Sequence, residues 1–167
     1  MFYAELNITS VEKESMTYIA DLSICDYFGD DHGGHLVAVG WLDGGHEYPT
    51  GKMERGDYEH LERLLKDPFQ PFVYMGIHEC NICQFNGAGG TYNIFLPDDG
   101  DILVAPELIL HYINCHGYLP PERFIRAMKQ LSTTRNMAYK KKLLQNNGSF
   151  LIRMNTAQQG GSFDLIG

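Results

Sequence analysis

Short, unbroken apolar runs along the chain alternate with amphipathic stretches. The clearest strand is predicted at residues 36–42, a continuous apolar run that contains the only tryptophan. Two further runs, 92–96 and 102–105, flank a Pro-Asp-Asp-Gly sequence and predict a β-hairpin. Stretches rich in β-forming residues predict a further strand at 72–77 and a strand or extended segment at 16–22.

Helical periodicity begins at residues 57–66, where Asp57 is a suitable N-cap and the leucines form one apolar face. A second helix is predicted from Pro106 to Cys115, because proline is tolerated in the first helical turn. Gly117 is the natural residue to end that helix.

The C-terminal third of the chain predicts a helix that starts at Pro120-Pro121-Glu122 and a basic helix within residues 133–146. Residues 149–154 are expected to form a last short strand, and residues 158–167 a loose polar tail.

These elements predict a single α+β domain with a small, mostly antiparallel sheet, a Cys-x2-Cys zinc knuckle and two to three C-terminal helices. We expect residues 1–15 to be an N-terminal extension that could pair as an edge strand. Residues 16–130 would form the zinc-binding domain, and residues 131–167 a basic helix followed by the tail.

The charge of the 167-residue chain is unevenly distributed, with a formal total of −8 that disfavours nucleic-acid binding by the whole molecule. Eight of the 13 basic residues lie between Arg123 and Gly161, where no Asp or Glu occurs. We interpret this as an acidic body with a basic arm folded onto it. The alternative is that the arm meets an acidic partner or a phosphate backbone.

Targeting signals are not evident in the sequence. The N-terminus lacks the basic and apolar regions of a signal peptide, and no run of 18 apolar residues predicts a membrane span. The four cysteines are clustered rather than spaced as a disulfide framework. We therefore expect a cytoplasmic protein without membrane contact.

The strongest chemical signal is a pair of motifs, Cys80-x2-Cys83 and His111-x4-His116. Zinc prefers four thiolate and imidazole ligands in a tetrahedron, and two ligands from each of two elements join those elements together. The spacing of the two histidines at a helix end is one that closes Cys2His2 sites. The sequence therefore predicts a Zn²⁺ site at Cys80, Cys83, His111 and His116.

Two residues compete for places in this site. Cys115 shares a helix face with His111, and His78 precedes the knuckle and could serve as a ligand or as an outer hydrogen-bond donor. The non-metal interpretation is that the cysteines are small core residues and the histidines are satisfied by hydrogen bonds. A thioredoxin-like redox motif needs a helix after the knuckle, and the sequence predicts none there. A deaminase needs a His-x-Glu motif well upstream of its Cys-x2-Cys motif, whereas Glu79 here directly precedes Cys80.

Other polar clusters are weaker candidates. Residues 45–52 resemble a phosphate-binding loop, but the spacing is wrong and Met53 stands where magnesium binding needs Ser or Thr. Asp30, Asp31, His32 and His35 are interpreted as a solvated loop rather than a metal site.

A polar turn offers one further site. His46, Asp43 and Thr50 either line a pocket or belong to an ordinary polar turn.

Several stretches are familiar in combination. They are Met16-Thr-Tyr-x2-Asp-Leu-Ser, Val39-Gly-Trp-Leu-x3-His46-x2-Pro-Thr-Gly51, Gly76-x-His78-x-Cys80-x2-Cys83 and Ala105-Pro-Glu-Leu-Ile-x-His111-Tyr-Ile-x2-His116-x-Tyr118-x-Pro-Pro-x2-Phe124. This set resembles a family of small bacterial proteins of unknown function over roughly residues 16–130. The resemblance implies that Met16 corresponds to the family start, and it favours His111 and His116 over Cys115 as ligands.

A zinc ion held by four protein ligands is closed to substrates, and closed sites are structural. We therefore expect a zinc-binding protein that acts as a binding or adaptor module for a protein or small ligand. One alternative is a hydrolase-like enzyme whose metal keeps an open position beside His46, His78, Asp43 or Glu79. A second alternative is a nucleic-acid-binding module that uses the basic arm.

Overall fold

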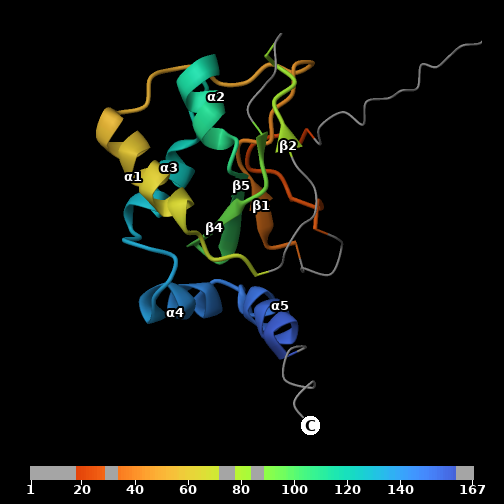
Figure 1. Cartoon of the computed structure of the whole chain (residues 1–167), viewed down its shortest axis with the longest axis vertical. Coiled ribbons are helices and arrows are strands. Elements are labelled where there is room, and N and C mark those ends of the chain that lie inside the picture. Colours follow the sequence, from red (N-terminus) through yellow and green to blue (C-terminus); the bar gives the residue numbers. More distant parts are fainter. Residues whose placement is uncertain (1–17, 29–33, 72–77, 84–88, 161–167) are drawn as a thin grey trace, which may run out of the picture.

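The computed structural model describes residues 18–28, 34–71, 78–83 and 89–160. Its elements are β1 (Leu36–Ala38), α1 (Arg55–Lys66), β2 (His78–Glu79), β3 (Gly89–Gly90), β4 (Asn93–Asp98), β5 (Asp101–Pro106), α2 (Ile109–His116), α3 (Glu122–Lys129), α4 (Met137–Gln145) and α5 (Ser149–Gly160). Figure 1 shows the strands at the centre with helices around them, which confirms the expected α+β class.

The main sheet has three strands in the order β1-β5-β4. The β4–β5 hairpin is antiparallel, as the sequence predicts, whereas β1 pairs with β5 in parallel, so the sheet is mixed. Asp99 and Gly100 form the hairpin turn with φ values of 47° and 82°. Two positive φ values in a two-residue turn match the twist of the flanking strands.

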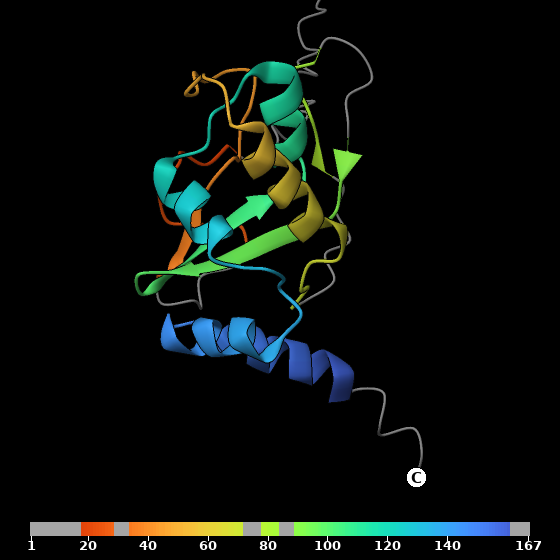
Figure 2. The ribbon, with the colours of Figure 1, turned by 90° about the vertical axis from the view of Figure 1, so that its left-hand side faces the viewer.

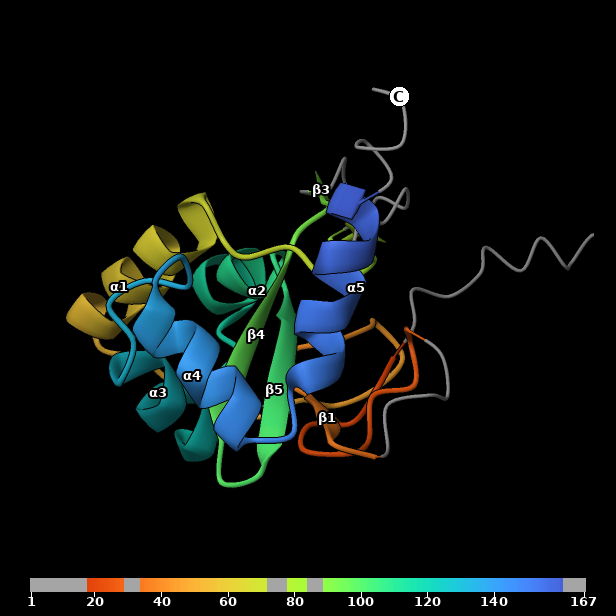
Figure 3. The ribbon, with the colours of Figure 1, turned by 90° about the horizontal axis from the view of Figure 1, so that it is seen from below.

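Strands β4 and β5 are buried along almost their whole length, with Ile94, Leu96, Ile102, Leu103 and Val104 fully enclosed. Continuous apolar strands of this kind need cover on both faces of the sheet. In Figure 2, α1, α2 and α3 lie on one face and α4 and α5 on the other. Figure 3 shows α4 and α5 side by side beneath the sheet.

The first strand is shorter than the sequence predicts because Gly40, with a φ of 77°, turns the chain away after Ala38. A Cβ atom at Gly40 would lie 3.0 Å from the side chain of Ile109, so α2 packs directly against this turn. The expected strand or extended segment at 16–22 is represented in the described residues by one isolated bridge, from Ile19 to Trp41. A second bridge joins Ile24, just after this stretch, to Val37.

Helix α1 begins two residues before Asp57, and its N-cap position is occupied by Glu54, whose side chain makes no capping hydrogen bond. Asp57 instead lies in the first turn and pairs with Lys129 of α3 at 3.5 Å. On the same helix, Nε2 of His60 lies 2.7 Å from the carbonyl oxygen of Leu131, just after α3. His60 therefore fastens α1 to the end of α3.

Helix α2 begins at Ile109, and not at Pro106 as the sequence suggests. Pro106 is the last residue of β5, opposite Asn93 of β4. Between the strand and the helix, the carboxylate of Glu107 accepts hydrogen bonds from the backbone of Thr91 and Tyr92 at 3.2 and 3.4 Å.

Helix α4 lies within the predicted range, and the side chain of Asn136 caps it by accepting from the backbone N–H of Tyr139. The strand expected at 149–154 is wrong, because these residues begin α5. Phe150 and Leu151 are buried neighbours on that helix, so packing against the sheet selects the helical form of a short apolar run.

Two other predicted strands, within residues 1–15 and at 72–77, lie outside the described residues. None of the helices in the described part of the chain has the length and apolarity that a bilayer crossing requires.

Candidate metal centre

The Cys80-x2-Cys83 knuckle follows β2 directly. Strand β2 pairs in an antiparallel manner with β3, joining Glu79 to Gly89. Cys80 is buried, with 6% of its surface exposed, and Cys83 is half-buried. The knuckle therefore places one sulfur in the core and a second nearer the surface.

A turn from the first half of the chain holds the knuckle from the side. The backbone N–H of Gly44 donates to the side-chain oxygen of Asn81 at 2.9 Å. A Cβ atom at Gly44 would lie only 3.2 Å from the carbonyl oxygen of Asn81. Glycine at this position permits the close approach of the two backbones.

Helix α2 supplies the two imidazoles. His116 is its last residue, and Gly117 ends it in the left-handed conformation, with a φ of 63° and its N–H bonded to the carbonyl of Tyr112. The hydroxyl of Tyr48 donates to the carbonyl of His116 at 3.1 Å. The end of α2 is thus fixed from two directions, and His116 can reach the same centre as His111.

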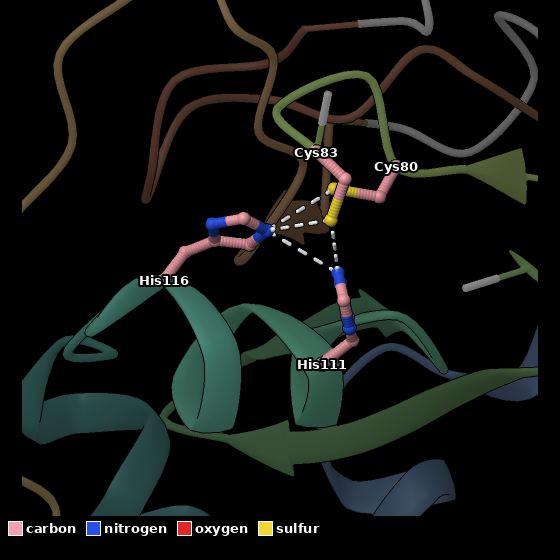
Figure 4. Close-up of side chains that lie close together, drawn as sticks. All are labelled: Cys80, Cys83, His111 and His116. Atoms are coloured by element: carbon pink, nitrogen blue, oxygen red, sulfur yellow. Dashed lines mark hydrogen bonds between the residues drawn. The ribbon is translucent and has the colours of Figure 1, made fainter. Parts of the chain in front are cut away.

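Four potential ligand atoms converge between the knuckle and α2 (Figure 4). Sγ of Cys83 lies 3.1 Å from Nε2 of His111 and 3.2 Å from Nε2 of His116. The two Nε2 atoms are 3.2 Å apart, and Sγ of Cys80 is 3.5 Å from Nε2 of His116. All four atoms lie within 4.8 Å of one another, so Cys80, Cys83, His111 and His116 form a cluster that can hold a metal ion.

Hydrogen bonding alone accounts poorly for the geometry of this cluster. Nε2 of His116 lies within 3.5 Å of three other ligand atoms, those of Cys80, Cys83 and His111. One ring nitrogen carries either one proton or one lone pair, so it can serve one such partner well. Three partners around one nitrogen fit a cation at the centre better than a proton.

The distances also match a tetrahedral ion. With metal–sulfur bonds of about 2.3 Å and metal–nitrogen bonds of about 2.0–2.1 Å, the edges of the tetrahedron measure roughly 3.3–3.8 Å. The four separations between ligand atoms described above run from 3.1 to 3.5 Å. Small shifts of these side chains would therefore bring the cluster to the size that zinc requires.

The pKa shifts of the cluster describe its metal-free form. Removal from water raises the pKa of the Cys83 thiol, and the neighbouring Cys80 raises it further. Burial lowers the pKa of His111, and the adjacent His116 lowers it further. Without a cation, both shifts favour neutral groups. A divalent ion between the sulfurs would stabilise thiolates and reverse the first shift.

The competing residues stand apart from the cluster or outside the described residues. Cys115 is exposed and does not belong to the four converging side chains. The backbone of His78 belongs to β2, but its side chain lies outside the described part of the structure. Glu79 is exposed beside the knuckle.

The polar turn brings two of its three candidate residues together. Asp43 is 7% exposed, and its carboxylate lies 2.6 Å from Nδ1 of His46. The ring of His46 stacks on that of Tyr18, with 3.7 Å between the centroids. Thr50 instead forms a bridge with Tyr118, after α2.

The loop cluster of Asp30, Asp31, His32 and His35 lies mostly outside the described residues, which exclude its first three members. His35 is described, and its Nδ1 lies 3.5 Å from a carboxylate oxygen of Asp101.

Contacts that brace the cluster, such as Tyr48 with His116 and Gly44 with Asn81, were not predicted. Each joins residues distant in sequence, and no local pattern marks them.

No curated protein and no solved structure is significantly similar to the chain. A family model does match residues 17–129, a range that contains all four residues of the cluster. The chain belongs to the family described as Domain of unknown function (DUF7919).

Proposed function

We propose that this protein binds one Zn²⁺ ion through Cys80, Cys83, His111 and His116, and that the ion is structural. The observation that carries the proposal is the position of Nε2 of His116, within 3.5 Å of three other ligand atoms. Two thiolates and two imidazoles in a tetrahedral arrangement are typical of zinc.

The number of protein ligands supports a structural role. Catalytic zinc sites have three protein ligands and a water molecule, whereas structural sites have four protein ligands. An ion here would join the knuckle to the end of α2, two segments that the β4–β5 hairpin separates in sequence. We propose that the zinc-stabilised surface serves a binding or adaptor role, with a protein or small ligand as partner.

The test is metal analysis combined with X-ray absorption at the zinc edge, on protein purified under reducing conditions. We expect one zinc per chain with two sulfur and two nitrogen neighbours, at about 2.3 Å and 2.0–2.1 Å. His116→Ala should lower zinc affinity by more than the roughly 10- to 100-fold that loss of an outer hydrogen-bond partner costs.

Cys115→Ala is the matched control, since Cys115 neighbours His116 but is exposed and outside the cluster. It should leave zinc content and the absorption spectrum unchanged. Purified protein without stoichiometric zinc would overturn the proposal. Three protein ligands and one oxygen neighbour would instead favour the enzyme alternative, with the Asp43–His46 pair as the nearby acid–base group.

A further inference from the structure

A cavity of about 440 Å³ opens between α4, α5 and the segment that follows α1. Helices α4 and α5 lie at the opposite end of the molecule from α2 (Figure 1). Small-molecule sites in proteins typically have volumes of roughly 300–1,000 Å³. The cavity is therefore large enough for a small ligand and is separate from the metal centre.

Apolar residues make up half of the ten that line this cavity. Tyr139 and Leu143 are buried residues of α4 that line it, and the partly buried Phe69 and Ile152 face it from the neighbouring segments. Met137, in the first turn of α4, also lines the cavity although 65% of its surface is exposed. An apolar molecular body would bury this surface on binding.

Most polar groups around the cavity already have partners. The hydroxyl of Thr134 accepts from the backbone N–H of Phe69 at 2.9 Å. The side chain of Asn136 caps α4. Arg135 is held by the carboxylate of Asp67 at 3.0 Å.

Lys140, unlike Arg135, has no ion-pair partner among the described residues. It is one of two cationic residues that line the cavity, and no carboxylate lines it. The ion pairs among the described residues involve Arg135 and Lys129 but not Lys140. Helices α4 and α5 contain no acidic residue, and the adjoining Lys141 and Lys142 add positive potential. An anionic group at the rim would find its charge partner in Lys140.

We propose that this cavity binds a small amphiphilic carboxylate, with its apolar body among Phe69, Leu143 and Ile152 and its carboxylate at Lys140. A polyanion would need several available cations, whereas the described cavity lining offers one. A cationic amphiphile would be repelled. The proposal does not depend on the metal centre.

The probes are three eight-carbon compounds that differ only in their head group: octanoate, octanol and octylammonium. Each is titrated into ¹⁵N-labelled full-length protein, and binding is followed by NMR. We expect octanoate to bind most tightly and to shift amide signals of α4 and α5. Equal affinities for the three probes, or shifts that do not involve α4, would overturn the proposal.

Matched variants on α4 test the charged part of the site. Lys140→Glu should weaken octanoate binding at least about fivefold, since it replaces an attractive charge with a repulsive one. Lys141→Glu changes charge equally on an exposed neighbour that does not line the cavity, and should stay within about twofold of the wild type.

For the apolar part, Met137→Glu should weaken binding, whereas Leu144→Glu should not. Leu144 is also exposed, at 52%, but does not line the cavity. All four substitutions are at exposed positions, so the variants should fold, and thermal unfolding checks this. Equal effects within either pair would contradict the proposal.

Two further measurements test whether the cavity is a membrane-binding surface or depends on the metal. Vesicles of phosphatidylcholine and phosphatidylglycerol test the first possibility. Vesicle binding that Lys140→Glu and Lys141→Glu weaken equally, without octanoate binding, would overturn the proposal. Metal chelation should leave octanoate affinity unchanged, and loss of that affinity on chelation would contradict the independence of the cavity.

Discussion

The β4–β5 hairpin and the knuckle represent two ways of stabilising a short segment. The hairpin has two six-residue strands with side chains such as Phe95 and Leu103 almost wholly buried. The knuckle follows a two-residue strand, Asn81 is exposed, and Cys83 is half-buried. Burial of apolar area stabilises the first region. The knuckle buries little apolar area, and we propose that a metal ion supplies the stabilisation that burial does not.

Chelation of the metal should separate the two regions most strongly. Structural zinc sites bind with apparent free energies of about 10–16 kcal/mol in small peptides, so removal of the ion should sharply lower the local opening free energy at the knuckle and α2. Amides of β4 and β5 should keep most of their protection. Hydrogen exchange with and without chelator measures both regions in one experiment.

The contrast in that experiment is its own control, because both regions belong to the same molecule. Equal loss of protection in β5 and α2 would mean that the hairpin also depends on the ion. The comparison between burial and metal binding would then fail.

The converse change is Phe95→Ala in β4. Phe95 is 1% exposed, so its truncation should leave a cavity and lower the free energy of unfolding by about 3–5 kcal/mol. Urea denaturation of the zinc-loaded protein measures this loss. If the folded variant still binds one zinc per chain, the two regions are stabilised separately. Loss of zinc at urea concentrations where the variant is folded would contradict that separation.

A smaller effect is expected at Asp21, whose carboxylate joins the segment after α2 to the segment after β1. It accepts from the hydroxyl of Tyr118, after α2, at 2.9 Å and from the backbone N–H of Gly40, after β1, at 2.9 Å. Burial raises the pKa of Asp21 above its usual 3.8, although these hydrogen bonds oppose the shift. The native state therefore binds this proton more tightly than the unfolded state.

The contribution of Asp21 to stability is accordingly greatest below about pH 3.8 and falls as the pH rises through its native-state pKa. Relative to Asp21→Asn, the wild type should lose free energy of unfolding as the pH rises through this window and then reach a plateau. Urea titrations at several pH values measure the difference. A difference that does not vary with pH would show that Asp21 has the same pKa in both states.

The sequence was most informative where local chemistry determines the structure. The turn at Asp99–Gly100 follows from residues that tolerate positive φ, and the strands beside it follow from their apolar runs. The four residues of the cluster were predicted together because Cys and His at these spacings have few other common uses.

The errors occurred where tertiary packing decides between local alternatives. Residues 149–154 are a short apolar run that suits a strand or a buried helix, and burial of Phe150 and Leu151 beneath the sheet selects the helix. Pro106 suits the first turn of a helix, but the pairing of β4 with β5 extends to it and delays α2 to Ile109.

The position of the hairpin between the two halves of the cluster has a consequence for biosynthesis. Cys80 and Cys83 leave the ribosome before the hairpin, and His111 and His116 after it. The nascent chain therefore first presents two thiols without their imidazole partners. Hairpin contacts are local in sequence and form quickly, whereas the cluster must close a longer loop. We infer that a complete ligand set arises only after the hairpin has emerged, so that metal uptake would report that synthesis has passed α2.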